Sequence, residues 1–197
     1  SVVKLDVASD TSGPFPSPCA ESDRFVAVDK GPIITPDLLN MPADVTIADN
    51  TSYLRVEGDV RLYFWAGKMG LESTGAHSVL MADEGNVMLE EGIRVPSPYG
   101  HPKLFRHPSG QVRMFHLIPD GLGSHISEDG VNFTLEEGVR ISSVDAGLER
   151  IGGMSVVALP EGGYRGYFSN LGIPGVAPQD TVDQLKSATS TDQLNWS

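Results

Sequence analysis

The feature of this sequence that most constrains its fold is an internal repeat. The segment Glu90-Glu91-Gly92-Ile93-Arg94-Val95 returns 46 residues later as Glu136-Glu137-Gly138-Val139-Arg140-Ile141. Six matched positions in a chain of 197 residues are poorly explained by chance. A repeat of this period is typical of folds built from supersecondary units, each of which buries its apolar face against the next unit.

A second repeated element is a short acidic turn. The pattern Ser-x-Asp-x-x-x-aromatic occupies residues 127–133 and 190–196, and looser copies start at Met81 and Cys19, so the four copies begin 62, 46 and 63 residues apart. The pattern predicts a strand, a tight turn locked by an Asp that accepts backbone N–H groups, and a strand that opens with a large apolar residue. We therefore interpret the Ser and Asp as structural and the closing aromatic residue as a wedge between units.

A third repeated element is a pair of strands. Residues 43–64, 101–115 and 153–168 each read as a strand, a polar turn and a second strand that is rich in Tyr and Phe. The 22 Gly and 14 Pro residues fit a chain with many turns. Each repeat then contains about four short strands in roughly 50 residues, which is the content of a propeller blade.

Charge and composition exclude several classes of partner. With 14 basic and 26 acidic residues the net charge is −12, so we expect no nucleic-acid partner. No apolar run is long enough to predict a membrane span, and the N-terminal sequence shows no basic region followed by an apolar core. The single Cys excludes an internal disulfide and a multi-cysteine zinc site. The sequence leaves the compartment open.

The order of these elements resembles the five-bladed β-propeller glycosidases, which include glycoside hydrolase family 43 and related furanosidases. The resemblance covers most of residues 17–197 and implies an all-β fold, a β-propeller of four-stranded antiparallel blades. Because the first and last repeats are incomplete, we expect a partial ring whose open blade edges could support self-association. The expected organisation is a single propeller over residues 1–197, with a half blade at about 1–40 and blades at 41–97, 98–143 and 144–197.

The resemblance also implies acidic residues where the first strand of each blade begins. Glycoside cleavage needs paired carboxylates, because one donates a proton while the other stays ionised. At the three blade entries the sequence has Asp44, His101 and Glu149. We expect Asp44 to be the base and Glu149 the acid, with His101 in a position where the family has Asp. His can serve in acid–base chemistry as well.

Four further residues are expected to bind the sugar. Arg150 and Asp145 lie beside Glu149 in the sequence, and Tyr99 and Trp65 offer flat aromatic faces on which sugars stack. Each candidate also has a structural interpretation. A carboxylate at a strand start often makes only local turn bonds, a neighbouring Glu and Arg can form an exposed ion pair, and aromatic residues can belong to the core.

The function that these expectations support is hydrolysis of a glycosidic bond in an oligosaccharide, with a carbohydrate as the ligand. A non-catalytic carbohydrate-binding propeller and a purely structural module are the alternatives, because one fold hosts many functions. No His-x-x-x-His or similar spacing is present, so no metal site and no cofactor are expected. An ion such as calcium in a central channel stays open.

Overall fold

The computed structural model describes residues 34–56, 59–68, 71–72, 74–81, 87–97, 100, 102–107, 109–170 and 185–197. Contacts divide the chain into residues 1–33 and 34–197, and everything described belongs to the second unit. The predicted half blade at the N-terminus therefore lies almost wholly outside the described residues.

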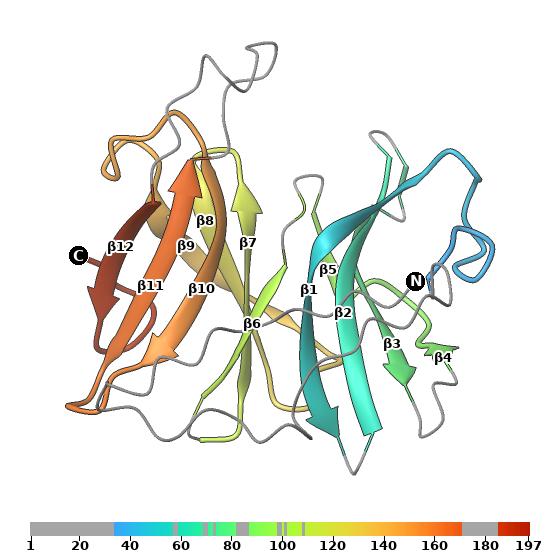
Figure 1. Ribbon diagram of the computed structural model, residues 1–197, viewed down its shortest axis with the longest axis horizontal. Coiled ribbons are helices and arrows are strands. Elements are labelled where there is room, and N and C mark those ends of the chain that lie inside the picture. Colours follow the sequence, from blue (N-terminus) through green and yellow to red (C-terminus); the bar gives the residue numbers. More distant parts are fainter. Residues whose placement is uncertain are drawn as a thin grey trace, which may run out of the picture. The chain divides into compact units, whose positions relative to one another are not determined.

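The second unit consists of three antiparallel sheets (Figure 1). The first sheet contains β1 (Thr46–Val56), β2 (Asp59–Gly67), β3 (Gly75–Met81) and β4 (Val87–Leu89) in that order, and β5 (Val95–Pro96) also pairs with β3. The second contains β6 (Lys103–Arg106), β7 (Val112–Ile118), β8 (Gly121–Ser127) and β9 (Thr134–Ser142). The third contains β10 (Ile151–Ala158), β11 (Tyr164–Asn170) and β12 (Leu185–Ser190).

These sheets confirm the predicted fold class. The strands follow one another as meanders of antiparallel neighbours, and no helix occurs among the described residues. The first strand differs in extent from its prediction, because β1 starts at Thr46 rather than Asp44 and continues to Val56. An irregularity in the register between Ala48 and Ser52 lets this long strand stay paired with β2.

Burial along the strands shows how the sheets stack. In β7 every residue from Val112 to Leu117 is buried, so both faces of the second sheet are covered. In β11 burial alternates: Tyr164 and Phe168 are buried, whereas Arg165 and Tyr167 between them are exposed. Successive residues of a strand point to opposite faces. The third sheet therefore buries one face against the second sheet and exposes the other among the described residues.

Two apolar clusters join the sheets. Tyr63 and Ala76 of the first sheet pack with Met114 of the second, and Phe115 of the second packs with Met154 of the third. The aromatic residues that close the acidic turns enter these clusters as predicted. Phe133 meets Tyr63 edge to face at 6.3 Å between ring centroids, and Trp196 meets Phe115 at 6.1 Å.

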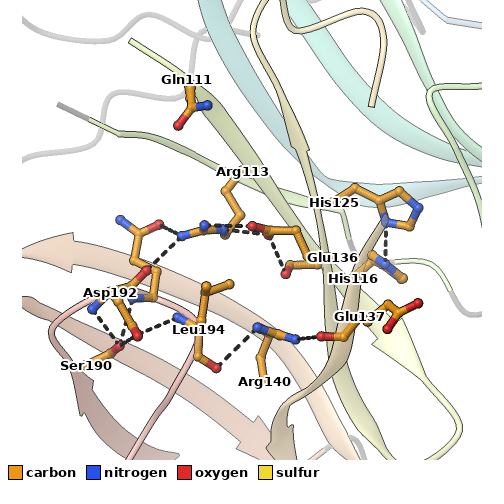
Figure 2. Close-up of polar contacts among 12 residues, drawn as sticks. Gln111, Arg113, His116, His125, Glu136, Glu137, Arg140, Ser190, Asp192 and Leu194 are labelled. Atoms are coloured by element: carbon orange, nitrogen blue, oxygen red, sulfur yellow. Dashed lines mark hydrogen bonds and ion pairs between the residues drawn. The ribbon is translucent and has the colours of Figure 1, made fainter. Parts of the chain in front are cut away.

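An arginine on the second strand of a sheet connects that sheet to the next one (Figure 2). Arg113 of β7 donates from Nε and Nη2 to the carboxylate of Glu136 on β9, at 2.7 and 2.8 Å. Ser124 of β8 donates its hydroxyl to the same carboxylate at 2.8 Å. The remaining nitrogen, Nη1, donates to the backbone carbonyl of Asp192 in the third sheet's acidic turn at 3.1 Å. We call this set of contacts the latch.

The first sheet carries the same latch. Arg61 of β2 donates from Nε to Glu90 at 2.7 Å, and Ser78 donates to that carboxylate at 2.7 Å. Arg61 Nη1 donates to the carbonyl of Asp129 in the second sheet's turn at 3.1 Å. Burial raises the pKa of Glu90, and the hydrogen bonds from Arg61 and Ser78 outweigh it, so the net pKa is lowered. Glu90 therefore stays ionised and paired.

The repeated Glu-Glu-Gly-x-Arg segment contributes two residues to the contacts between neighbouring sheets. Its first Glu is the carboxylate of the latch, and its Arg reaches the next acidic turn. Arg94 donates to the carbonyl of Val131 at 3.3 Å and Arg140 to that of Leu194 at 3.4 Å. Each also donates to the carbonyl of the second Glu in its own segment. The repeat thus fixes one sheet to the next.

The acidic turns present the carbonyls that the arginines bind. Asp192 Oδ1 accepts the N–H groups of Leu194 and Asn195 at 2.8 and 2.9 Å, and Ser190 accepts a further backbone N–H. The Asp129 turn has the same bonds. The N–H groups of Asn195 and Leu194 and the side chain of Asn195 hold the pKa of Asp192 far below its usual range. With their N–H groups turned inward, the turns direct their carbonyls to the preceding sheet.

One exchange of residues distinguishes the two latches. Tyr63 donates its hydroxyl to the carbonyl of Gly130 at 2.7 Å, and a Cβ on Gly130 would lie 2.6 Å from that hydroxyl oxygen. In the next sheet Phe115 lacks the hydroxyl and Gln193 takes the glycine's place, with a positive φ of 64°. The fully buried Gln193 fills the space, and its Oε1 accepts from Arg113 at 2.8 Å.

The latch predicts that substituting Arg113 lowers the stability of the fold strongly, whereas substituting its counterpart Arg165 on the third sheet has little effect. Arg113→Met should lower the free energy of unfolding by about 3 kcal/mol, because it leaves a mostly buried carboxylate without its partner. Arg165→Met, at the matching position of the exposed face, should change it by less than about 0.5 kcal/mol. Urea unfolding followed by tryptophan fluorescence measures both. Equal effects of the two substitutions would contradict this role.

The residue exchange predicts coupling between Tyr63 and Gly130. Gly130→Gln should be strongly destabilising in the wild-type background, because its side chain meets the Tyr63 hydroxyl. Combined with Tyr63→Phe it should cost less, with a coupling free energy of about 1 kcal/mol or more in a double-mutant cycle. Additive effects in urea unfolding would show that the hydroxyl and the glycine do not compensate each other.

Candidate functional site

The candidate acid and base lie at equivalent places in two sheets. Asp44 stands two residues before β1, and Glu149 stands two residues before β10. His101 precedes β6 by the same interval but lies outside the described residues, as does Tyr99. β6 contacts both β1 and β10, and Figure 1 shows β1 and β10 running in the same direction. The starts of β1 and β10 therefore lie at the same end of these strands, with β6 between the two.

Asp44 is exposed and forms an ion pair. Its carboxylate accepts a hydrogen bond from the ammonium group of Lys68. The hydrogen bond and the positive charge of Lys68 lower the pKa of Asp44. Lys68 directly follows β2, whose last residue, Gly67, pairs with Thr46 at the start of β1. The hairpin thus brings a cation to the strand entry and keeps the carboxylate ionised, as a base requires.

Glu149 and Arg150 precede β10 without pairing with each other. Glu149 is exposed and Arg150 is half-buried. In the part of the chain that the structure describes, no hydrogen bond or ion pair joins either residue to the other or to Asp44. Among these residues, the exposed ion pair that was the structural interpretation of Glu149 and Arg150 does not form.

Trp65 is half-buried and fixed in place. Its indole N–H donates to the carbonyl of Ser97 at 2.8 Å. Gly100, with φ of +73°, lies against the ring, and a Cβ there would be 3.6 Å from the indole Cγ. Trp65 therefore packs beside the residue that separates Tyr99 from His101 in the sequence, which places it close to the entry of β6. The positive φ favours glycine at this position, because other residues rarely adopt it.

Asp145 lines a groove rather than a strand entry. The groove has a volume of about 500 Å³ and runs between β9 and β12. Lys186 and Trp196 line it with Asp145. The structure thus places Asp145 in this groove, and its contact with a sugar stays a prediction.

Two histidines of the second sheet form a pair that sequence reasoning did not single out. His116 Nε2 and His125 Nδ1 are 3.0 Å apart, and the Nδ1 of His116 contacts the carbonyl of Leu117 at 3.1 Å. Burial lowers the pKa of His116, and burial together with His116 lowers the pKa of His125 to about 4. Both rings are therefore neutral at pH 7. They lie on the neighbouring strands β7 and β8, and His116 directly follows Phe115, which pairs with Lys103 at the start of β6.

Sequence reasoning also missed Lys68 and the latch. The signal for Lys68 was the hairpin register, which returns the end of the second strand to the start of the first. The signal for the latch was an Arg two residues before the aromatic of each Tyr- or Phe-rich strand, at Arg61, Arg113 and Arg165. The first two of these arginines are each followed by a Glu-Glu-Gly segment, at residues 90–92 and 136–138.

Metal-binding and membrane-spanning features were searched within the same residues. No group of three or more His, Cys, Asp or Glu side chains is placed to hold a metal ion in the described ranges. Of the segments that the structure describes, none is a helix long and apolar enough to cross a bilayer.

Comparison with solved structures places the fold. An endo-1,4-β-xylanase from Bacteroides thetaiotaomicron matches with a TM-score of 0.58 and 15% identity over 77% of this chain and 50% of its own. A mutant α-L-arabinanase from Cellvibrio cellulosa matches with a TM-score of 0.57 and 16% identity over 89% and 61%. A thermostable family-43 glycoside hydrolase matches with a TM-score of 0.53 and 12% identity over 78% and 51%.

These matches define the class of fold: the second unit has the β-propeller architecture of family 43 and related glycosidases. The resemblance seen in the repeats is thereby confirmed at the level of the fold. The chain spans 50% to 61% of the length of these three proteins. No protein-family model matches the sequence. No curated protein matches it either.

The Asp44–Lys68 pair predicts a measurable change in one carboxyl group. Lys68→Met should raise the pKa of Asp44, because it removes the hydrogen bond and the positive charge that lower it. Carbon-detected NMR titration of the Asp carboxyl groups measures this pKa directly. Lys186→Met, a lysine on the third sheet, is the control and should leave it unchanged. An unchanged Asp44 titration in Lys68→Met would show that the ion pair does not persist in solution.

Proposed function

We propose that this chain carries a glycosidase-type site that acts on a glycosidic bond of an oligosaccharide, with Asp44 as the base and Glu149 as the acid. The observation that carries the proposal is the equivalent placement of the two carboxylates, each two residues before the first strand of its sheet. In the proposal, Arg150 and His101 orient the sugar and Trp65 and Tyr99 provide stacking surfaces. The fold it shares with glycosidases supports this assignment.

The proposed chemistry follows from the two carboxyl groups. Glu149 protonates the leaving glycosidic oxygen while Asp44 remains ionised and draws a proton from the attacking water. Lys68 supports this division of roles, because it lowers the pKa of Asp44. Glu149 has no such cation bonded to it among the described residues.

A non-catalytic carbohydrate-binding role is the second candidate, and the exposure of Glu149 favours it. The general acid of a glycosidase is commonly kept protonated by an apolar, water-poor setting. An exposed Glu beside an Arg that has no partner among the described residues is equally suited to hydrogen bonds with sugar hydroxyls. Asp145 in its groove would then add a contact to a bound oligosaccharide.

The proposal predicts that Glu149→Gln abolishes turnover and keeps the fold. The amide cannot protonate the leaving group, so kcat on an aryl glycoside or oligosaccharide should fall at least about 1000-fold, with an unchanged melting temperature. Glu161→Gln, in the turn between β10 and β11, is the matched control and should retain full activity. Turnover that survives Glu149→Gln would overturn the assignment of the acid.

A thermal-shift series separates the two candidates. The chain is melted with xylo-, arabino- and galacto-oligosaccharides at millimolar concentration, and the same sugars are analysed for cleavage. A ligand at about 100 times its Kd should stabilise the fold by about 2.7 kcal/mol. Stabilisation together with cleavage supports the glycosidase. Stabilisation without cleavage supports the binding role, and no response to any sugar argues against both.

A further inference from the structure

Two histidines of the second sheet stand where the other two sheets have apolar residues. The first position is three residues after the arginine that β2, β7 and β11 share, and the second lies on the next strand, opposite the residue directly after that arginine. The residues at the first position are Phe64, His116 and Phe168, and those at the second are Val79, His125 and Ala188. Burying a polar ring costs free energy unless it is hydrogen-bonded, so this exchange calls for a specific role.

The two rings bond to each other on the face of the second sheet that meets the first sheet. His125 lies opposite Met114, and His116 is two residues along the strand from Met114, so both rings share the face on which Met114 packs with Tyr63. Nε2 of His116 lies 3.0 Å from Nδ1 of His125, as Figure 2 shows. His116 is only 5% exposed, and His125 is half-buried.

The acceptors around the pair determine where its protons lie. The carbonyl of Leu117 only accepts, so Nδ1 of His116, at 3.1 Å from it, carries a proton. Nε2 of the neutral ring is then an acceptor, and Nδ1 of His125 donates to it. Protonation of either ring places a positive charge in this site. Protonation of both also turns two N–H groups toward each other, which removes the hydrogen bond.

The carbonyl of Leu117 also connects the pair to the first sheet and to Trp65. It accepts a hydrogen bond from the hydroxyl of Ser97 at 3.5 Å, and the carbonyl of Ser97 accepts the indole N–H of Trp65 at 2.8 Å. Ser97 directly follows β5 and is 5% exposed. The histidine pair therefore ends at the point where the first sheet, the second sheet and Trp65 meet.

Within the second sheet, one carboxylate favours a proton on the pair. Glu136 of β9 raises the pKa of His125, but this carboxylate is already paired with Arg113. Lys103 of β6 pairs with Phe115 and so lies on the other face of the sheet. Burial outweighs the effect of Glu136 and lowers the pKa of His125 to about 4.

The titratable side chains of the first sheet that face the second sheet bind elsewhere. Arg61, Tyr63 and Arg94 each donate to a backbone carbonyl of the acidic turn at residues 129–131. His77 stacks on Phe64, on the opposite face of the first sheet. None of these four residues shifts the pKa of either histidine of the pair.

We propose that the His116–His125 pair is an acid-sensitive contact between the first and second sheets, which holds Ser97 and Trp65 in place only while both rings are neutral. Burial lowers the pKa of both rings below 6.5, the ordinary value. The unfolded chain then binds more protons than the folded one below that pH, so the stability of the fold falls as the pH falls from about 6.5 to about 4. The consequence for sugar stacking on Trp65 rests on the proposed function, and the contact itself does not.

The first test compares the pH dependence of urea unfolding in the intact chain and in the double variant His116→Phe/His125→Val, which carries the residues of the first sheet. Through His125 alone, the equilibrium constant for unfolding should rise about 30-fold between pH 8 and pH 5. This part of the rise should be missing from the double variant, because the other titrating groups are common to both chains. The same pH dependence in the two chains would overturn the proposal.

The second test needs no substitution. Long-range proton–nitrogen NMR spectra of the intact, folded chain should show the proton on Nδ1 of both rings at pH 7, and acid should move the indole N–H signal of Trp65 together with the titration of His125. The indole of Trp196 is the internal control, because it donates to the carbonyl of Gln193 within its own turn at 2.9 Å. A proton on Nε2 of His116 at pH 7, or a Trp65 signal that does not follow His125, would contradict the proposed contact.

Sugar binding supplies the functional measurement. For any oligosaccharide that binds, the Kd should increase more between pH 7.5 and pH 5 in the intact chain than in the double variant, and an equal increase would refute the link from the pair to the stacking surface. If no sugar binds at either pH, the proposed function fails, and the Trp65 signal still decides whether the pair holds this residue.

Discussion

The contact on which the arrangement of the sheets depends is the arginine that links each sheet to the acidic turn of the next. Arg61 and Arg113 each use one end of the guanidinium for a glutamate of their own sheet and the other for a backbone carbonyl of the following one. A planar group with five donors suits this double role. Breaking such a mostly buried pair is costly, because the carboxylate left behind has lost its partner. The apolar clusters bury hydrophobic surface between the sheets, and the latch fixes which residues of neighbouring sheets meet.

In this arrangement the acidic turns also supply the carbonyl groups that the arginines bind. Asp129 and Asp192 gather backbone N–H groups, and this leaves the turn carbonyls facing the arginines of the preceding sheet. The residue that follows the Asp depends on the aromatic residue opposite it. It is Gly130 opposite the hydroxyl of Tyr63 and Gln193 opposite Phe115, which has no hydroxyl. A repeated motif can therefore vary in sequence while its geometry stays constant.

Because the latches fix how the sheets stack, they also fix where the strand entries lie. Asp44 and Glu149 are about a hundred residues apart in the sequence, and they lie at the same end of the first strands of two sheets, β1 and β10, with β6 between them. The ion pair of Asp44 with Lys68 shows a cation of the scaffold acting on a candidate catalytic group. Comparison of the matching positions also makes the second sheet informative, since His116 and His125 stand where the first and third sheets have apolar residues.

The sequence by itself determined the repeat, the all-β class, the structural role of the acidic turns and the wedge residues Phe133 and Trp196, because these depend on local spacing and on side chains whose preferences act within a few residues. It also located the strand entries that carry Asp44 and Glu149. Only the tertiary structure decided that Glu90 and Glu136 pair with Arg61 and Arg113, that Lys68 meets Asp44, and that Asp145 lines a groove beside β12. Those contacts join residues from different strands or different sheets, and which charges meet there depends on pairing register and sheet stacking, neither of which a single strand's pattern contains.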